Sequence, residues 1–403
     1  MNILVLNCGS SSIKYQLLDM SASPVLLARG IVDKIALPAG KFTHVPAARQ
    51  PSVVERPVPD HAAGIQLILS ALVDSSTGVL ASLTDIHAVG HRVAHGGEYF
   101  PGSVLVDAGV KEKIAACSAL APLHNPANLT GIEALESLLP GTPQVAVFDT
   151  SFHQTLPPKA YTYGLPLALC RRHGVRRYGF HGTSHAFVAR RACELLGWDI
   201  GEKKIITCHL GNGSSITAIE RGRSVDTSMG FTPSAGVIMG TRAGDVDPGA
   251  LLYLVEREGM DAEAANALVN KRSGLLGVSG LTPDCRELWE AVRDGSGDAR
   301  LALDMLGYQV KKYIGSYAAV LNGVDLVVFT GGIGENDHDI RRAACEGMQY
   351  LGIDFDDAAN HGVRGKDKVL TRPGSRVTVM SINTNEELVI ATDTMILAAP
   401  LQT

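Results

Sequence analysis

The stretch Asn2-Ile-Leu-Val-Leu-Asn-Cys-Gly-Ser-Ser-Ser-Ile-Lys14 decides how this chain is expected to fold. Its residues up to Asn7 are mostly apolar, as in a buried strand. Small residues follow as far as Ser12, and an extended pattern resumes at Ile13. The chain therefore opens on a predicted β-hairpin with a glycine–serine turn, a kind of turn whose backbone N–H groups can surround an anion.

The same pattern returns in the middle of the chain. Lys204-Ile-Ile-Thr-Cys-His209 is expected to be a strand, Leu210-Gly-Asn-Gly-Ser-Ser215 the turn, and Ile216-Thr-Ala-Ile219 the returning strand. Ser12 and Ser215 lie 203 residues apart, which is half of the 403-residue chain. Because the match is short, chance is the alternative, but we favour duplication of one domain plan. Two such copies would face each other with two phosphate-binding hairpins across a single cleft.

A third glycine-rich turn, Gly331–Asn336, follows the predicted strand Asp325–Thr330. One turn of this kind is most often an ordinary hairpin turn, but three that each follow a buried strand favour a polyphosphate nucleotide. The chain lacks the Gly-x-x-x-x-Gly-Lys-Ser/Thr pattern of P-loop enzymes. Its Gly-x-Gly pairs at 211–213 and 332–334 lack the third glycine of the dinucleotide fingerprint, which argues against a Rossmann dehydrogenase.

Composition narrows the class of protein. Glycine accounts for 43 of 403 residues, which fits the turns of an α/β protein combined with loops around an anion. The net charge of −5 argues against a general nucleic-acid or membrane-surface binder. Neither a long apolar run nor a signal peptide is apparent, and seven scattered cysteines suggest neither a zinc site nor disulfides. We expect a soluble cytoplasmic enzyme.

Further elements are expected around the hairpins. Helical spacing occurs over residues 61–73, 109–120, 249–258 and 299–321, and buried strands are expected over 144–148 and 377–382. The proline-rich segment Pro38–Pro59 is expected to be an irregular surface excursion. A C-terminal helix is expected to open at Thr384, which has capping-box spacing with Glu387 and would leave Glu386 free for another role.

Three basic residues near the predicted loops suit phosphoryl chemistry. Lys14 leaves the first hairpin where it could meet a phosphate, with a solvated strand lysine as the alternative. Arg92 lies in His91–Gly97, which we interpret as a glycine-rich turn after a strand, and Arg242 lies in the loop Gly240–Gly249. A surface arginine is usually solvated, but an arginine among glycines favours a ligand, because guanidinium can bind carboxylate or phosphate bidentately.

Acidic and histidine candidates are harder to rank. Asp149 stands at the carboxyl end of a predicted buried strand, where α/β proteins bind ligands, although it could simply cap a turn. His181 lies among small residues in Tyr178-Gly-Phe-His-Gly-Thr-Ser-His185, and spacing alone cannot rank it above its competitors, His153 and His185. Any loop carboxylate could bind magnesium, among them Asp245, Asp247 and Asp284.

The two hairpin stretches, Val5–Lys14 and Cys208–Ser215, resemble the two signatures of the acetate kinase family. Other matching stretches follow the family's order: Phe148–His153, Gly179–His185, Gly240–Gly249, Phe329–Asn336 and Asn383–Leu388. The resemblance runs from residue 2 to about residue 398. It implies the α/β fold of the sugar kinase, heat-shock chaperone and actin superfamily, in which two duplicated ribonuclease-H-like (actin-like ATPase) domains surround a central nucleotide cleft. The domains would be 1–150 with 386–403, and the nucleotide-binding 151–385.

The resemblance also implies an activity. Family members transfer the γ-phosphoryl of ATP to acetate reversibly, giving acetyl phosphate and ADP, with Mg²⁺ as cofactor and Mn²⁺ as a substitute. The implied protein is a cytoplasmic homodimer with small-molecule substrates and no nucleic-acid or membrane partner. Three alternatives stay open: a propionate kinase of the same family, an actin-like or chaperone-like ATPase switch, and pyrophosphate in place of ATP as the donor.

Catalytic roles follow from the matching motifs. Asn7 and Glu386 would hold Mg²⁺, directly or through water. Arg92 and Arg242 would bind the acetate carboxylate and the transferring phosphoryl, to which His181 would add a hydrogen bond. Asp149 matches the family's active-site acid. Because acetate, like other carboxylic acids, is already ionised at pH 7, it needs no general base, and we expect Asp149 to orient metal, water or arginine.

The remaining matched residues would bind the nucleotide and the acetate methyl group. The nucleotide phosphates would meet Ser10, Ser12, Lys14, His209, Leu210, Gly211, Asn212 and Gly213. The adenosine would meet Asp284, Cys285, Arg286, Gly331, Gly332, Ile333, Gly334 and Glu335. The methyl pocket would be formed by Val93, Leu123, Phe180 and Pro233. Propionate-preferring members often carry a smaller residue at the place of Val93, so we expect propionate to be the poorer substrate.

Overall fold

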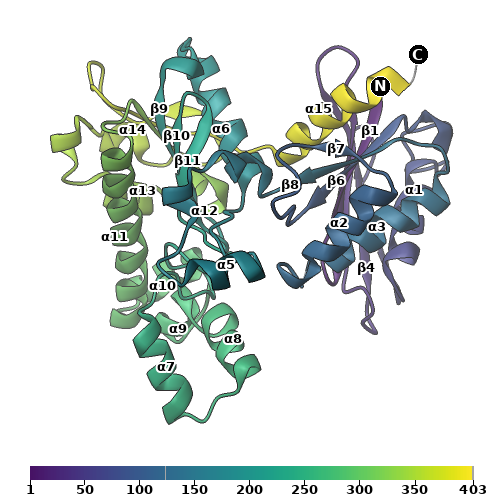
Figure 1. The fold of residues 1–403 in the computed structure, drawn as a ribbon. Coiled ribbons are helices and arrows are strands. Elements are labelled where there is room, and N and C mark those ends of the chain that lie inside the picture. Colours follow the sequence, from purple (N-terminus) through teal and green to yellow (C-terminus); the bar gives the residue numbers. More distant parts are fainter. Residues whose placement is uncertain (123, 402–403) are drawn as a thin grey trace. The chain divides into compact units, whose positions relative to one another are not determined.

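The computed structural model describes residues 1–122 and 124–401. The chain forms two compact units (Figure 1). Unit 1 comprises Met1–Ser151 and Asn385–Thr403, and unit 2 comprises Phe152–Thr384. Among the described residues, none of the helices has the length and apolar character that a bilayer-spanning segment needs.

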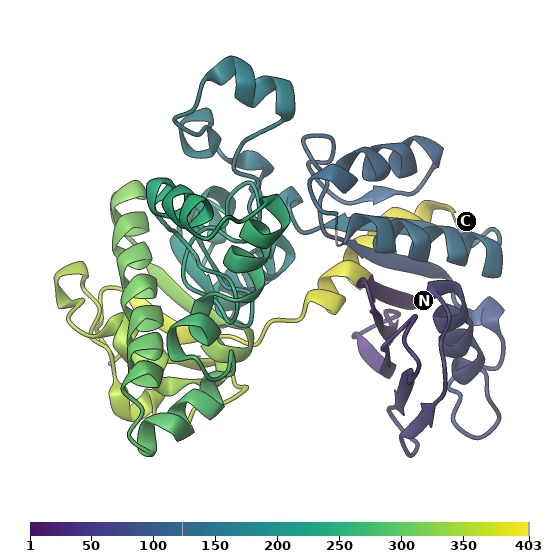
Figure 2. The ribbon, with the colours of Figure 1, turned by 90° about the horizontal axis from the view of Figure 1, so that it is seen from below.

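Unit 1 is built on an eight-stranded sheet in the order β5-β4-β3-β2-β1-β6-β8-β7. Its strands are β1 Asn2–Cys8, β2 Ser12–Asp19, β3 Val25–Asp33, β4 Lys41–Pro46, β5 Ser52–Glu55, β6 Ala88–Val93, β7 Val104–Leu105 and β8 Gln144–Phe148. Its helices are α1 His61–Leu72, α2 Ala108–Ala116, α3 Asn125–Leu138 and α15 Glu386–Ala398. Figure 2 shows α15, drawn in yellow, returning to the purple and blue strands of this unit.

The apolar run of β1 works as the sequence predicts, because successive side chains of a strand point to opposite faces. Leu4 and Leu6 pack on one face, in the core that contains Ile65 of α1. Ile3 and Val5 pack on the other face, in the core that contains Ile390 of α15. A strand covered on both faces has no polar side, which explains why the run is continuous.

Unit 2 has a six-stranded sheet in the order β11-β10-β9-β12-β14-β13. Its strands are β9 Lys204–His209, β10 Ser215–Glu220, β11 Arg223–Thr227, β12 Leu326–Thr330, β13 Lys368–Val369 and β14 Thr378–Ser381. Its helices are α4 Pro158–Tyr161, α5 Leu167–His173, α6 Gly182–Leu196, α7 Pro248–Arg257, α8 Ala262–Lys271, α9 Gly274–Ser279, α10 Cys285–Arg293, α11 Gly297–Val320, α12 Gly331–Asn336, α13 His338–Cys345 and α14 Asp357–Asn360.

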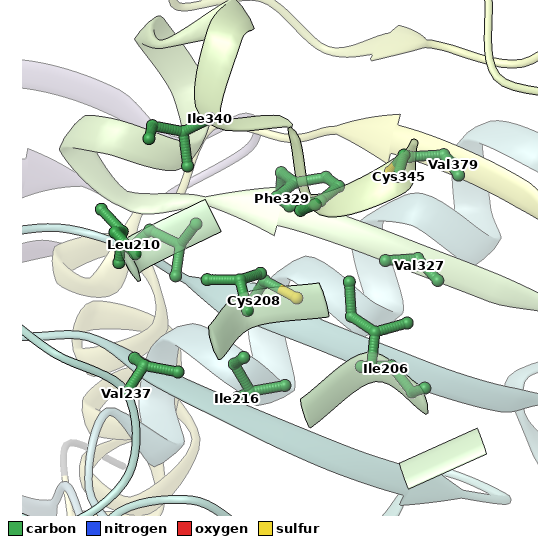
Figure 3. Packing of buried hydrophobic residues seen from close by; sticks show 14 of the residues in the cluster. Ile206, Cys208, Leu210, Ile216, Val237, Val327, Phe329, Ile340, Cys345 and Val379 are labelled. Carbon is green, nitrogen blue, oxygen red and sulfur yellow. The ribbon is translucent and has the colours of Figure 1, made fainter. Parts of the chain in front are cut away.

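The sheet of unit 2 is also covered on both faces. Ile206, Cys208 and Phe329 pack in one large apolar core, which Figure 3 shows from close by. Ile205 and Val328, their neighbours along β9 and β12, face the opposite way and pack against residues of α6.

The two sheets share one topology, which confirms the duplicated fold. β3-β2-β1-β6-β8 in unit 1 and β11-β10-β9-β12-β14 in unit 2 each begin with an antiparallel meander and continue with two parallel strands. The last pair before the turn is Cys8 with Ile13 in unit 1 and His209 with Ser215 in unit 2. Four residues lie between the first pair and five between the second, so the turn of unit 2 is one residue longer.

Four expectations about local structure were wrong. The segment Pro38–Pro59 contains strands β4 and β5, because Phe42 and His44 alternate inward between the prolines. Arg92 lies on β6 and not in the turn after it. Gly331–Asn336 forms the short helix α12. The cap of α15 is Asn385 and not Thr384: its side-chain oxygen accepts from the backbone N–H of Leu388 at 3.1 Å, which puts Glu386 and Glu387 together in the first turn.

Candidate active site

In unit 1, the structure brings three of the predicted residues together. Asn7, Arg92 and Asp149 stand at or just beyond the carboxyl ends of β1, β6 and β8, which are parallel neighbours. Arg92 donates to both carboxylate oxygens of Asp149, from Nη2 at 2.5 Å and from Nε at 3.1 Å. Its Nη1 donates to Oδ1 of Asn7 at 3.2 Å. The geometry is that of a bidentate guanidinium–carboxylate pair with the amide oxygen on its flank.

Glu386 adds a second carboxylate to this cluster. Burial, and after it the charge of Asp149, raise the pKa of Glu386 to about 7, while the charge of Arg92 opposes the shift. The protein's own cations therefore compensate the two carboxylates only in part. Asp149 itself is only 1% exposed, and Arg92 donates to both of its carboxylate oxygens.

These oxygen groups suit a magnesium ion. Mg²⁺ prefers oxygen ligands and usually takes one or two carboxylates together with waters and substrate phosphates. Asn7, Asp149 and Glu386 offer an amide oxygen and two carboxylates with incompletely compensated charge, which fits such a cation. Over residues 1–122 and 124–401, no group of three or more His, Cys, Asp or Glu side chains gathers as a protein-only metal site.

The first hairpin turn is held in place from both sides. Gly9 N–H donates to the carbonyl of Ser12 at 2.8 Å, and the carbonyl of Gly9 lies 2.7 Å from Nε2 of His61. The Cys8 carbonyl accepts from the side chain of Asn128 at 2.7 Å. Ser10 is exposed and Ser12 half-buried. Lys14 is exposed, and it lines a hollow of about 310 Å³ with Arg29 and Glu387.

In unit 2, the second hairpin turn lies against two of the predicted catalytic residues. A Cβ atom at Gly213 would stand 3.3 Å from Nη1 of Arg242 and 3.5 Å from Nε2 of His181. Only a glycine lets the turn come this close without displacing the guanidinium. The rings of His181 and His209 stack, with their centroids 4.2 Å apart and their planes at 24°.

His181 has an unusual backbone. Its φ of 56° places it in the left-handed region, immediately before α6. A residue other than glycine in that region carries a strain of about 1–3 kcal/mol, and such strain is concentrated at functional sites. Burial argues against the two histidines that were the alternatives to His181 as the functional one. His153 and His185 are fully buried, and burial lowers the pKa of His153 to about 4. His181 is the half-buried one of the three, so it is the one with a ring that a ligand could reach.

Arg242 has an environment opposite to that of Arg92. No carboxylate of the described residues forms an ion pair with it, and burial lowers its pKa. Its Nη1 donates to the carbonyl of Pro233 at 3.1 Å and lies 3.9 Å from the sulfur of Met239. Met239 packs with Phe180 and Met229, all buried. An uncompensated guanidinium thus borders an apolar wall.

Sequence reasoning missed Met229 and Met239 in this wall. Met239 directly precedes the Gly240-Thr-Arg242 stretch, which is the one local signal that could have pointed to it. Of the other predicted pocket residues, Val93 is fully buried in the core of unit 1, beside Phe100 and Phe148. Leu123 lies outside the described residues.

The residues predicted to bind adenosine also have structural partners. Asp284 caps α10, accepting from the backbone N–H of Arg286 at 2.8 Å, and forms an ion pair with the Arg286 side chain. Burial raises the pKa of the Cys285 thiol to about 12, so it stays protonated. Oε1 of Glu335 accepts from the backbone N–H groups of Gly331 and Thr384, both at 3.0 Å, and so ties α12 to the segment after β14.

The three loop carboxylates considered as magnesium ligands accept hydrogen bonds from other parts of the protein. Asp245 accepts from the backbone N–H of Gly236 and from the hydroxyl of Tyr313. Asp247 caps α7 by accepting from Gly249 N–H at 2.9 Å. With Asp284 capping α10, each of the three carries a structural hydrogen bond.

Comparison with known proteins identifies close relatives. The sequence profile of the Acetokinase family matches residues 2–392. The chain is 53% identical over 395 residues to an acetate kinase of Parabacteroides distasonis, covering 98% of both chains. It is 53% identical over 397 residues to one of Moorella thermoacetica, covering 98% of this chain and 99% of the other.

Solved structures agree with the sequence relatives. A crystal structure of Porphyromonas gingivalis acetate kinase matches with a TM-score of 0.95 at 50% identity, covering 98% of this chain and 99% of that one. A propionate kinase from Francisella tularensis subsp. tularensis matches with a TM-score of 0.90 at 40% identity, with the same coverage.

Proposed function

Because the chain belongs to the Acetokinase family, we propose that it transfers the γ-phosphoryl group of ATP to acetate, reversibly, giving acetyl phosphate and ADP. One observation in unit 2 carries the substrate assignment. An uncompensated guanidinium, Arg242, lies between the glycine turn at Gly213 and the apolar wall that includes Met239. At this place the guanidinium could bind the carboxylate of a small anion and a phosphate beside it, and the apolar wall could contact the methyl group of the anion.

The chemistry requires no proton transfer on the acceptor. An acetate oxygen forms the new bond to phosphorus while the bond from phosphorus to the ADP oxygen breaks, and the electron pair leaves with ADP. Acetate is already ionised at neutral pH, so Asp149 has no proton to remove. Its two oxygens accept from Arg92, and we assign it the role of orienting that guanidinium.

Electrostatic stabilisation is then the main task of the protein. Two anions must approach in line, and the transferring group passes through a loose transition state with charge on its oxygens. We assign Arg92 and Arg242 to the acetate carboxylate and the phosphoryl group, and His181 to a further hydrogen bond on the phosphoryl group. Such fixed donors act without reorganising as the charge develops.

We assign nucleotide phosphates to the two hairpin turns and to Lys14, and adenosine to Asp284–Arg286 and Gly331–Glu335. Asn7 and Glu386 would hold Mg²⁺, with Asp149 close by. The bound ion would neutralise phosphate charge and act as a Lewis acid on the phosphate oxygens. We also propose that the two units are the two ribonuclease-H-like domains of the family. The homodimer and the cytoplasmic location remain predictions.

Two alternatives are kept as outcomes of the test. A propionate kinase is one, since one matching structure is a propionate kinase, although at 40% identity against 50–53% for the acetate kinases. The other is an ATPase switch, which needs no acetate. The test is trapping of acetyl phosphate as its hydroxamate in the presence of ATP, Mg²⁺ and acetate, with propionate in a parallel reaction. A higher kcat/KM for acetate supports the proposal, and a higher value for propionate overturns the substrate assignment.

A further inference from the structure

A continuous line of hydrogen bonds leads from the interior of unit 2 to His181. Oγ1 of Thr207 on β9 lies 2.7 Å from Nδ1 of His185. Nε2 of His185 lies 2.7 Å from Oγ of Ser215, the first residue of β10. The same Oγ lies 2.9 Å from Nδ1 of His181. Thr207, His185 and Ser215 are fully buried, whereas His181 is half-buried, so the line runs from the interior to a less buried histidine.

Counting protons leaves the contact between Ser215 and His181 only two directions. A hydroxyl has one hydrogen to donate and two lone pairs that can accept, and a neutral imidazole has one N–H and one accepting nitrogen. His185 is neutral, because burial, together with the neighbouring His153 and His209, holds its pKa well below 6.5. His185 therefore donates once and accepts once along the line, and Ser215 either donates to Nδ1 of His181 or accepts from it.

In the first direction, Thr207 donates to His185, His185 donates from Nε2 to Ser215, and Ser215 donates to Nδ1 of His181. A neutral His181 then carries its proton on Nε2. In the reverse direction, Nδ1 of His181 donates to Ser215, and Nε2 of a neutral His181 becomes an acceptor. The tautomer of His181 is thus linked to the orientation of the buried Ser215 hydroxyl.

Only the first direction suits an anionic ligand. Phosphoryl oxygens accept hydrogen bonds, so a neutral imidazole can serve them only from a nitrogen that carries a proton. Nε2 of His181 is the ring nitrogen on the side of Gly213, 3.5 Å from the position that a Cβ there would take. Stacking on His209 and the left-handed backbone of His181 both restrict the ring.

We propose that Thr207, His185 and Ser215 are positioning residues that hold His181 as the Nε2–H tautomer, ready to donate to the transferring phosphoryl group. The inference rests on the role of His181 in the proposed function. It extends that role to three buried residues that act through His181. Residues of this kind fix a tautomer in the way that hydrogen-bond partners do for metal-bound and catalytic histidines.

Nitrogen NMR of the full chain, labelled with ¹⁵N in histidine, tests the proposal directly. A long-range ¹H–¹⁵N correlation at about pH 8 distinguishes protonated from unprotonated ring nitrogens, and His181→Gln assigns the His181 signals. We expect an unprotonated Nδ1 and a protonated Nε2 in the wild type. A protonated Nδ1, in the opposite tautomer or in the imidazolium, would overturn the proposal even if no variant at Ser215 folded.

Variants test whether the line causes the tautomer. Ser215→Ala removes the donor to His181, so we expect its Nδ1 to become protonated in a substantial fraction of molecules. We expect kcat to fall about tenfold, the scale of one lost hydrogen bond, with KM for acetate and ATP within about twofold of wild type. Thr217→Val is the matched control, since it removes another buried hydroxyl of β10, one that is hydrogen-bonded to the hydroxyl of Thr227.

The control should keep the wild-type tautomer and turnover. An unchanged His181 tautomer in Ser215→Ala would refute the causal claim, and a loss of turnover in Thr217→Val as large as in Ser215→Ala would show that the effect is one of general packing. The spectrum needs no turnover. A protein that fails to phosphorylate acetate would therefore contradict the proposed function, while the tautomer test would still be decided by its own signals.

Discussion

The contrast between the two arginines that we assign to the active site leads to a prediction about stability as well as rate. Arg92 forms a bidentate pair with the buried carboxylate of Asp149, whereas Arg242 has no carboxylate partner among the described residues. Both are assigned to anion binding, so Arg92→Ala and Arg242→Ala should each lose turnover. Only Arg92→Ala should also lose stability, because it leaves a buried charge unpaired.

The structure sets the size of this difference. Breaking a buried ion pair costs about 3–5 kcal/mol, and we expect the lower end, about 3 kcal/mol, because the Arg92 side chain is still 23% exposed. For a domain the size of unit 1 this corresponds to a Tm lower by about 6–12 °C. Arg242→Ala removes one hydrogen bond, to the Pro233 carbonyl, of about 1 kcal/mol, and also removes a desolvated charge. Its Tm should stay within about 4 °C of wild type.

The assay combines thermal unfolding with acetyl phosphate formation. We expect kcat to fall by about 10²–10³ in both single variants, the usual loss when one donor to a developing charge is removed. Arg92→Ala/Asp149→Ala serves as the control, since it removes both charges and should recover most of the lost Tm without recovering turnover. The reasoning would be refuted if Arg92→Ala unfolded at the wild-type temperature, or if Arg242→Ala lost as much stability as Arg92→Ala.

Three other measurements follow from the same geometry. Asp149→Asn should lower kcat, because Arg92 is held less firmly, but its pH–rate profile should show the same ionisations as that of the wild type. If one of these ionisations disappeared in the variant, Asp149 would have a role in proton transfer. Chelation with EDTA should abolish turnover without unfolding the protein, and added Mg²⁺ or Mn²⁺ should restore it; full activity in EDTA would exclude the assignment of Asn7 and Glu386 to a metal. Stability should be complete above about pH 6.5 and should decline toward pH 4, because burial lowers the pKa of both His91 and His153 to about 4 and the unfolded chain takes up their protons first. Urea unfolding at pH 7 and pH 5 should therefore differ by about 2 kcal/mol for each histidine, His91→Asn should reduce the difference, and equal stability at both pH values would contradict it.

The sequence-based prediction of the fold succeeded where the signal was local. The two hairpins whose first strands end at Cys8 and His209 could be predicted from apolar runs bounded by small residues. The matching topology of the two sheets confirms the duplication. It failed where pairing partners decide the structure. Strands β4 and β5 lie between prolines, and they form because β4 pairs with β3 and β5 pairs with β4.

Prediction of the site residues also succeeded where the signal was local and failed where it was not. Asp149 could be located because it follows a buried strand, and Asn7 through the family motif; the parallel strands then bring the two positions together. Met229 and the line from Thr207 to His181 could not, because their partners come from segments far apart in the chain and only packing brings them into contact. The helix cap was misplaced by one residue, since Thr384 and Asn385 both have capping side chains.

The central claim is that acetate accepts the phosphoryl group, and the ratio of products tests it most directly. Purified protein with ATP and Mg²⁺ should release ADP only when acetate is present, and should then form one acetyl phosphate for each ADP. ADP released without acetate, or released with no acetyl phosphate alongside it, would contradict the account.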